Sequence, residues 1–129
     1  HCVTDCVIMN SWLPEIFNGT GTECCDQTGI ECSESRITEM FVSFSNASSN
    51  LGNSSLTGEI PPDIGLLTAL IQLNLPENAL TREIPSTLSK LAFLTTLKLQ
   101  INQLNGTVPS WLGAMKTLTH IQLNWNELN

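Results

Sequence analysis

The hydrophobic positions after residue 36 repeat with a period of 24 residues when the chain is compared with itself. The first half of each repeat combines spaced leucines with an asparagine. Its three copies are Leu70-x-x-Leu73-x-Leu75-x-x-Asn78-x-Leu80, Leu94-x-x-Leu97-x-Leu99-x-x-Asn102-x-Leu104 and Leu118-x-x-Ile121-x-Leu123-x-x-Asn126-x-Leu128. Within each copy two apolar positions alternate at period two, which predicts a short strand with one buried face.

The second half of each repeat is an Ile-Pro or Val-Pro step followed by apolar residues three positions apart. Its copies are Ile60-Pro61-x-x-Ile64-x-x-Leu67, Ile84-Pro85-x-x-Leu88-x-x-Leu91 and Val108-Pro109-x-x-Leu112-x-x-Met115. Proline holds the backbone extended there, before a short helical turn. One strand cannot cover its own apolar face, so the copies are expected to stack into a right-handed solenoid with a shared core. The predicted fold is an α/β repeat with a parallel β-sheet on the concave face and short helical or 3-10 segments on the convex side.

The period divides the second part of the chain, residues 37–129, into units 37–69, 70–93, 94–117 and a partial unit 118–129. The first unit opens with Ile37-x-x-Met40-x-Val42 and carries nine extra residues, which we place in the Ser/Asn-rich stretch 45–53 as a surface loop. The repeated asparagine stands where the chain leaves each strand. Its amide is expected to satisfy backbone groups of the turn, and neighbouring copies are expected to form a ladder.

Residues 1–36 are predicted to cap the first unit, because an open solenoid would expose the edge of its core. Apolar residues fall there near helical spacing, and Pro14 is expected to end one helical turn and open another. These apolar residues are Val7, Ile8, Trp12, Leu13, Ile16 and Phe17.

All five cysteines lie in this cap, which indicates a local disulfide staple. Adjacent Cys24 and Cys25 cannot easily bond each other, so each needs a different partner. We expect Cys6–Cys24 and Cys25–Cys32, which leaves Cys2 unpaired or intermolecular. A zinc site is disfavoured, because there is no Cys-x-x-Cys pair and neither His1 nor His120 belongs to a cluster with metal-ligand spacing.

Composition narrows the class of partner. Charged residues make up 13% of the chain and its net charge is −7, so binding to nucleic acid or to anionic lipid is not expected. No apolar stretch approaches the roughly 18 residues of a membrane-spanning helix. The chain begins at His1 rather than Met, which fits either the removal of a secretory leader or a fragment.

Four Asn-x-Ser/Thr triplets join the cysteines in predicting a secreted, extracellular glycoprotein. The acceptor asparagines are Asn18, Asn46, Asn53 and Asn105.

The repeat and the cap together resemble the plant-type leucine-rich-repeat family. The resemblance rests on Leu-Thr-Gly-Glu-Ile-Pro at 56–61, Leu-Asn-Gly-Thr-Val-Pro at 104–109, and a capping motif from Cys24 to Cys32 that Arg36-Ile37-Thr38 follows. The family includes receptor-kinase ectodomains, receptor-like proteins and polygalacturonase inhibitors. The resemblance implies an extracellular recognition fold and a second, short sheet near the Leu-x-Gly-x-Ile-Pro segments.

This chain departs from the family pattern at several points. Gln27 stands where the cap motif usually has Trp, Cys2 precedes the usual first cysteine, and Arg82 replaces the usual Gly. The cap also lacks the family's acidic, leucine-rich opening helix.

Strand residues between the buried leucines are expected to project from the concave face, in columns that cross the units. The first column is Glu39, Gln72, Thr96 and His120, and the second is Phe41, Asn74, Lys98 and Gln122. The third column contains Gln100 and Asn124, and at its edge lie Ile101 and Trp125. Trp125 and Ile101 either face a partner or pack between units, and the sequence leaves both open.

Enzymatic activity is not predicted. His120 lacks a neighbouring acid and nucleophile in its column, no carboxylate pair has glycosidase spacing, and no phosphate-binding loop or cofactor motif is present. An exposed polar face with aromatic residues suits a protein, peptide or cell-wall carbohydrate ligand. The alternative is a structural glycoprotein of an extracellular matrix or fibril, because the half-finished last unit would expose an apolar edge that a second copy could cover end to end.

Overall fold

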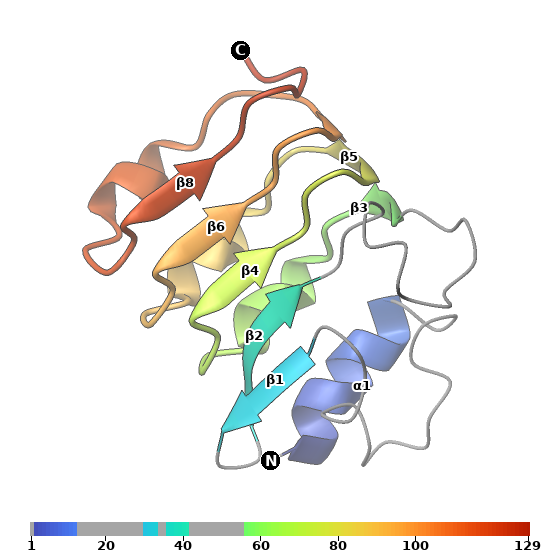
Figure 1. Cartoon of the computed structure of the whole chain (residues 1–129), viewed down its shortest axis with the longest axis vertical. Helices are drawn as coiled ribbons and strands as arrows, with labels where there is room; N and C mark the ends of the chain where they lie inside the picture. Colours follow the sequence, from blue (N-terminus) through green and yellow to red (C-terminus); the bar gives the residue numbers. More distant parts are fainter. Residues whose placement is uncertain (1, 13–29, 34–35, 42–55) are drawn as a thin grey trace.

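The computed structural model describes residues 2–12, 30–33, 36–41 and 56–129. It contains one α-helix, α1 (Cys2–Trp12), and a large sheet whose strands run in the order β1 (Ile30–Ser33), β2 (Arg36–Phe41), β4 (Gln72–Asn74), β6 (Thr96–Lys98) and β8 (His120–Gln122). In Figure 1 these strands lie side by side in that order, from the lower part of the view to the upper part. The predicted stack of parallel strands, one from each unit, is confirmed.

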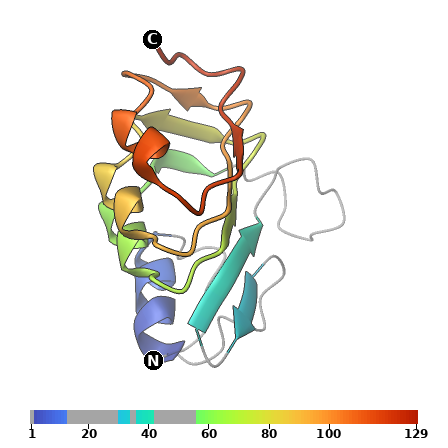
Figure 2. The same cartoon turned by 90° about the vertical axis from the view of Figure 1, so that its left-hand side faces the viewer.

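Short 3-10 helices lie on the side opposite the large sheet: η2 (Pro62–Leu66), η3 (Ser86–Lys90) and η4 (Ser110–Ala114). Figure 2 shows them as a column of turns parallel to the sheet. Each follows a proline with an extended backbone, such as Pro85 at φ −66° and ψ 134°, so the predicted task of the Ile-Pro step is confirmed.

A second, smaller sheet is formed by β3 (Thr57–Glu59), β5 (Ala79–Arg82) and β7 (Gln103–Leu104). Its strands pair in parallel, as the family resemblance implied. Three positions of this flank, each one repeat apart, share a left-handed backbone: Gly58 (φ 78°), Arg82 (φ 69°) and Gly106 (φ 81°). Arg82 therefore occupies a conformation that favours glycine.

One apolar core runs through the stack between the two faces. The repeat leucines of units 70–93 and 94–117 are fully buried, with no exposed surface at Leu73, Leu75, Leu97 and Leu99. Ile37 and Met40 of β2 are buried in the same way, which confirms the strand half assigned to the first unit. Val42 and the nine-residue insertion at 45–53 lie outside the described residues.

The repeated asparagines form the predicted ladder. Asn102 accepts a hydrogen bond at Oδ1 from the Leu80 N–H (3.0 Å), and its Nδ2 donates to the carbonyls of Leu75 (2.9 Å) and Leu99 (3.1 Å). Asn126 repeats the arrangement one unit later, with the Leu104 N–H at 3.0 Å. Each amide thus joins two consecutive units through backbone groups that the turn leaves unpaired.

The cap helix α1 is fixed to the first strand by one carboxylate. Asp5, almost completely buried, accepts hydrogen bonds from Arg36 Nε (2.9 Å) and from the Ile37 N–H (3.1 Å). Cys6 and Met9 face the core, whereas Val7 is 57% exposed. Of the apolar residues at helical spacing, Ile8 is buried as well, whereas Val7 lies on the exposed side of α1.

The cap also contributes a strand that the sequence did not predict. β1 pairs antiparallel with β2, so the large sheet is mixed rather than purely parallel. Ile30 of β1 is buried against the core. The first repeat strand is therefore shielded along its edge by the cap, as an edge strand requires. The predicted disulfide partners Cys24 and Cys25 lie outside the described residues, so the pairing stays a prediction.

No helix in the described part of the chain is both long and apolar enough to cross a membrane.

Candidate binding face on the large sheet

The outer face of the large sheet carries the predicted columns in register. Glu39 pairs with Gln72, Gln72 with Thr96, and Thr96 with His120 across neighbouring strands. The second column follows in the same way, from Phe41 through Asn74 and Lys98 to Gln122. The columns arise because the middle residue of each short strand, such as Leu97, points into the core and leaves its two neighbours outside.

The columns differ in how much side chain they present. His120, Gln122 and Asn124 are exposed, and the side chains of Glu39, Gln72, Lys98 and Gln100 are partly exposed. Asn74 and Thr96 are 5% and 9% exposed, so the expectation that they project as ligand contacts is wrong. Both lie on central strands with neighbours on each side, and their short side chains do not reach beyond those neighbours. The side chain of Phe41 lies outside the described residues.

Internal hydrogen bonds occupy the face near β2 and β4. Gln72 Nε2 donates to Glu39 Oε1 at 3.0 Å, and Asn74 Nδ2 donates to Gln72 Oε1 at 3.4 Å. These groups are already engaged with one another, so a ligand would have to compete for them.

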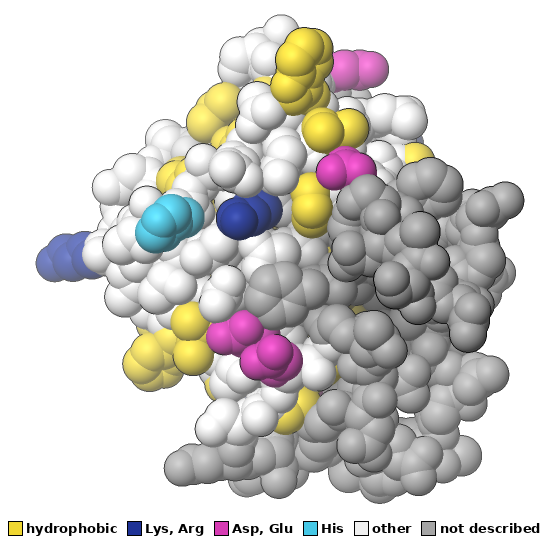
Figure 3. All heavy atoms as spheres, in the orientation of Figure 1, with side chains coloured by type: hydrophobic (Ala, Val, Ile, Leu, Met, Phe, Trp, Pro, Cys, Tyr) yellow, Lys and Arg dark blue, Asp and Glu magenta, His cyan; other side chains and the backbone are white. Residues whose placement is uncertain are grey.

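The face near β6 and β8 is less engaged. The one side-chain hydrogen bond of His120 among the described residues joins its Nδ1 to Thr119 Oγ1, 2.9 Å apart. The single ion pair among the described residues joins Arg36 to Asp5, which leaves the Lys98 ammonium without a carboxylate partner there. Figure 3 shows this face as a mainly uncharged surface on which charged and hydrophobic side chains are scattered.

Ile101 and Trp125 border this region, and the sequence left open whether they face a partner or pack between units. Ile101 is 47% exposed and Trp125 is 77% exposed, so neither is buried between units. Both have a left-handed backbone with φ 58°, and Glu77 occupies the same repeat position with φ 56°. This left-handed turn was not predicted from the sequence, although it recurs three residues after β4, β6 and β8. Ile101 and Trp125, on these turns, are therefore exposed at the edge of the large sheet rather than buried in the core.

The described residues contain no group of three or more His, Cys, Asp or Glu side chains placed to hold a metal ion. Of the four predicted glycosylation sites, Asn105 is exposed, immediately after β7. The other three, Asn18, Asn46 and Asn53, lie outside the described residues.

No family model and no curated protein matches the chain. Solved structures do. A plant ice-binding protein superimposes with a TM-score of 0.79 at 27% identity, over 96% of this chain and 41% of that one. The leucine-rich-repeat ectodomain of the receptor kinase SOBIR1 from Arabidopsis thaliana superimposes with a TM-score of 0.76 at 25% identity, over 96% of this chain and 67% of that one.

A third match is the plant peptide hormone receptor RGFR1 in complex with RGF2, at 32% identity and a TM-score of 0.65. That match covers 81% of this chain and 18% of the receptor. Each of the three matches extends over at least 81% of this chain, so the likeness concerns the stack of repeats as a whole. The chain is therefore similar in structure to plant extracellular leucine-rich-repeat ectodomains, the group of binding modules that its sequence resembles.

Proposed function

We propose that this chain is an extracellular recognition module that binds an extended peptide across β6 and β8. The observation that carries the proposal is a set of exposed or partly exposed side chains on these two strands and on the turns that follow them. Among the described residues, no side-chain hydrogen bond joins one member of this set to another. The proposed contacts are Lys98, Gln100, His120, Gln122, Asn124, Ile101 and Trp125.

The chemistry of this set suits a peptide backbone. Amide side chains such as Gln122 and Asn124 offer both hydrogen-bond donors and acceptors, which is what an extended peptide requires of its receptor. Trp125 supplies a large apolar surface of the kind that anchors partners at interfaces. The unpaired Lys98 ammonium favours a peptide with a carboxylate at the matching position. Similarity to a peptide hormone receptor points in the same direction.

Glu39 and Gln72 belong to the proposed site at its margin. Their mutual hydrogen bond would have to open before either contacts a ligand. We therefore expect them to contribute less to affinity than the residues of β6 and β8.

An extracellular location, a disulfide-stapled cap and glycosylation are parts of the same proposal. The pairing expected from the sequence is Cys6–Cys24 and Cys25–Cys32, and its two described members, Cys6 and Cys32, both lie in or against the core. Asn105 is exposed and accessible to a glycosyltransferase. Intact-mass measurement before and after reduction and glycosidase treatment tests both points, and five free thiols would contradict the stapled cap.

A peptide-display library selected on the immobilised chain tests the function. We expect selection to yield short sequences containing an acidic residue. Their binding should fall at least about tenfold in the double variant Lys98→Glu/Gln122→Ala, which removes a charge-assisted contact and an amide contact. The matched control Ser86→Ala/Lys90→Glu changes the opposite side of the same solenoid and should leave binding intact. Equal loss in both variants, or selected peptides indifferent to both, would contradict a site on β6 and β8.

A specific observation favours the second candidate, self-association in an extracellular assembly. Ile121 of the last unit is 44% exposed and Val108 of the unit before it is 53% exposed, so the last two units present apolar surface. A second copy could cover that surface end to end. Sedimentation at micromolar concentration tests this candidate, and a monomer unaffected by Ile121→Glu would exclude it.

A further inference from the structure

The 3-10 helices on the side opposite the candidate binding face do not pack uniformly. Between η2 and η3 the contact is close, because a Cβ placed on Gly65 would come within 2.5 Å of the Thr87 carbonyl oxygen. Thr87 Oγ1 also donates a hydrogen bond of 2.6 Å to the Pro62 carbonyl. Glycine at 65 and a small residue at 87 thus allow these two helices to touch.

The same two repeat positions are filled differently between η3 and η4. One unit later Ser89 takes the place of Gly65, and Trp111 takes the place of Thr87. A serine side chain and an indole ring cannot approach as a glycine and a threonine do, and η4 packs less closely on η3 than η3 packs on η2. The two larger side chains hold the helices apart.

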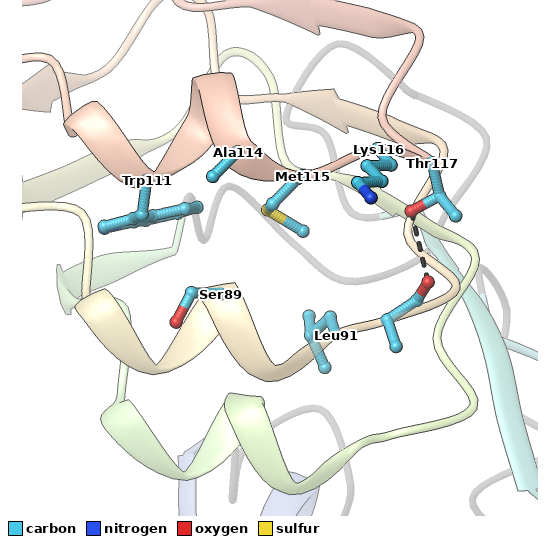
Figure 4. A pocket seen from close by; sticks show the side chains of 8 residues that line it. Ser89, Leu91, Trp111, Ala114, Met115, Lys116 and Thr117 are labelled. Atoms are coloured by element: carbon cyan, nitrogen blue, oxygen red, sulfur yellow. Dashed lines mark hydrogen bonds between the residues drawn. The ribbon is translucent and has the colours of Figure 1, made fainter.

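A hollow with a volume of about 290 Å³ lies between η3 and η4. Figure 4 shows Trp111 and Met115 on the η4 side, Leu91 below them on the η3 side, and Lys116 at one end. Leu91 is fully buried and forms an apolar floor, while Trp111 and Met115 are partly exposed walls.

The hydroxyl groups that line the hollow are already engaged. Ser89 Oγ donates to the Ser86 carbonyl at 2.7 Å, and Thr117 Oγ1 donates to the carbonyls of Ala92 (3.2 Å) and Leu94 (2.9 Å). The Lys116 ammonium, in contrast, has no carboxylate partner among the described residues, whose one ion pair is elsewhere. The hollow therefore combines an apolar interior with one uncompensated positive charge, in a chain whose net charge is −7.

We propose that this hollow is a second binding site, which takes a small amphipathic anion with an aromatic or aliphatic body and a carboxylate. The body would lie against Trp111, Met115 and Leu91, and the carboxylate would meet Lys116. The volume is at the lower end for small-molecule sites, which limits the ligand to about a dozen heavy atoms and its dissociation constant to the millimolar range.

The probe for the test is 4-phenylbutyrate, with the neutral 4-phenylbutanol as its matched counterpart. Titration is followed by the indole N–H resonance of Trp111 in ¹H–¹⁵N spectra, which the Trp111 variant assigns. We expect the acid to bind about fivefold more tightly than the alcohol, the effect of one partly solvated ion pair.

Two variants separate charge from shape. Lys116→Gln should abolish the preference for the acid and leave the alcohol unaffected. Ser89→Gly/Trp111→Thr installs the residues that close the η2–η3 contact and should abolish binding of both probes. Because this variant lacks the Trp111 indole, its titration is followed by the backbone amide resonance of Met115, which lines the hollow. Lys90→Gln, a lysine in η3 that does not line the hollow, is the control and should retain the preference.

The proposal is overturned if acid and alcohol bind alike to the unmodified chain, if Lys116→Gln keeps the preference, or if 10 mM acid leaves the Trp111 resonance unchanged. A circular dichroism spectrum of each variant separates loss of the site from loss of the fold. A ligand-binding defect confined to this hollow would leave peptide selection on β6 and β8 unaffected, so the two sites can fail independently.

Discussion

The strands of unit 94–117 and of the last unit occupy the same repeat position in different surroundings. Leu97 of β6 lies between β4 and β8 and is fully buried, whereas Ile121 has β6 on one side only and is 44% exposed. Leu94 and Leu99 are likewise fully buried, whereas Leu118 and Leu123 are only partly buried. In a solenoid the burial of a side chain is set by the neighbouring units, so one sequence pattern yields two energetic environments.

Truncating the central leucine tests this difference most strongly. Leu97→Ala should lower the free energy of unfolding by about 3 to 4 kcal/mol, because it leaves a cavity among fully buried neighbours. Ile121→Ala removes a side chain that is already partly in water and should cost about 1 kcal/mol. Urea unfolding of the two variants measures both values. Equal losses would show that the last unit is as well packed as the one before it.

The asparagine ladder extends the comparison from apolar to polar groups. Asn102→Ala should cost about 2 to 3 kcal/mol, since it strands the Leu80 N–H and the Leu75 and Leu99 carbonyls that the amide now satisfies. The control is Asn124→Ala, an exposed asparagine on the binding face, which should change stability by less than about 0.5 kcal/mol. The midpoints of urea denaturation would distinguish them. If Asn102→Ala left the free energy of unfolding unchanged, water would be able to satisfy the backbone groups that the asparagine side chain now bonds.

Two glycines at one repeat position test the packing of the 3-10 helices. Gly65→Ala should destabilise the chain by about 2 kcal/mol, because the new Cβ meets the Thr87 backbone. At Gly113 the same change meets nothing within 4 Å and should be neutral or slightly stabilising. Thermal unfolding of both variants gives the answer. If both are neutral, the η2–η3 contact is looser than its geometry indicates.

The smallest expected effect concerns the left-handed position of the second sheet. Arg82→Gly should raise stability by about 0.5 to 1 kcal/mol, because glycine adopts φ 69° without the clash that an L side chain incurs. At the equivalent position, Gly58→Ala should lower stability by a similar amount. No atom lies within 4 Å of the added Cβ there, so the loss would come from backbone strain and not from a steric clash with another residue. A destabilising Arg82→Gly would show that the arginine side chain makes a compensating contact.

The candidate site could be predicted only in part. The columns of the large sheet follow from the 24-residue period, so the register of Gln72, Thr96 and His120 was accessible from the sequence. The burial of Asn74 and Thr96 was not, because it depends on how far neighbouring side chains extend above a central strand. The outward direction of Ile101 and Trp125 depends on a left-handed turn that no residue type at that position demands.

Within the repeats, the sequence by itself determined which leucines face inward, where the large-sheet strand and the 3-10 turn of each unit fall, and which asparagines join the units. These features depend on residues that are close in the sequence and recur every 24 residues, so each copy of the pattern forms the same local backbone structure. Only the tertiary structure decided how completely each copy is buried, that β1 extends the sheet on its capped side, and that Ser89 and Trp111 separate η3 from η4. Those properties depend on contacts between units, where the size of one side chain limits the approach of another.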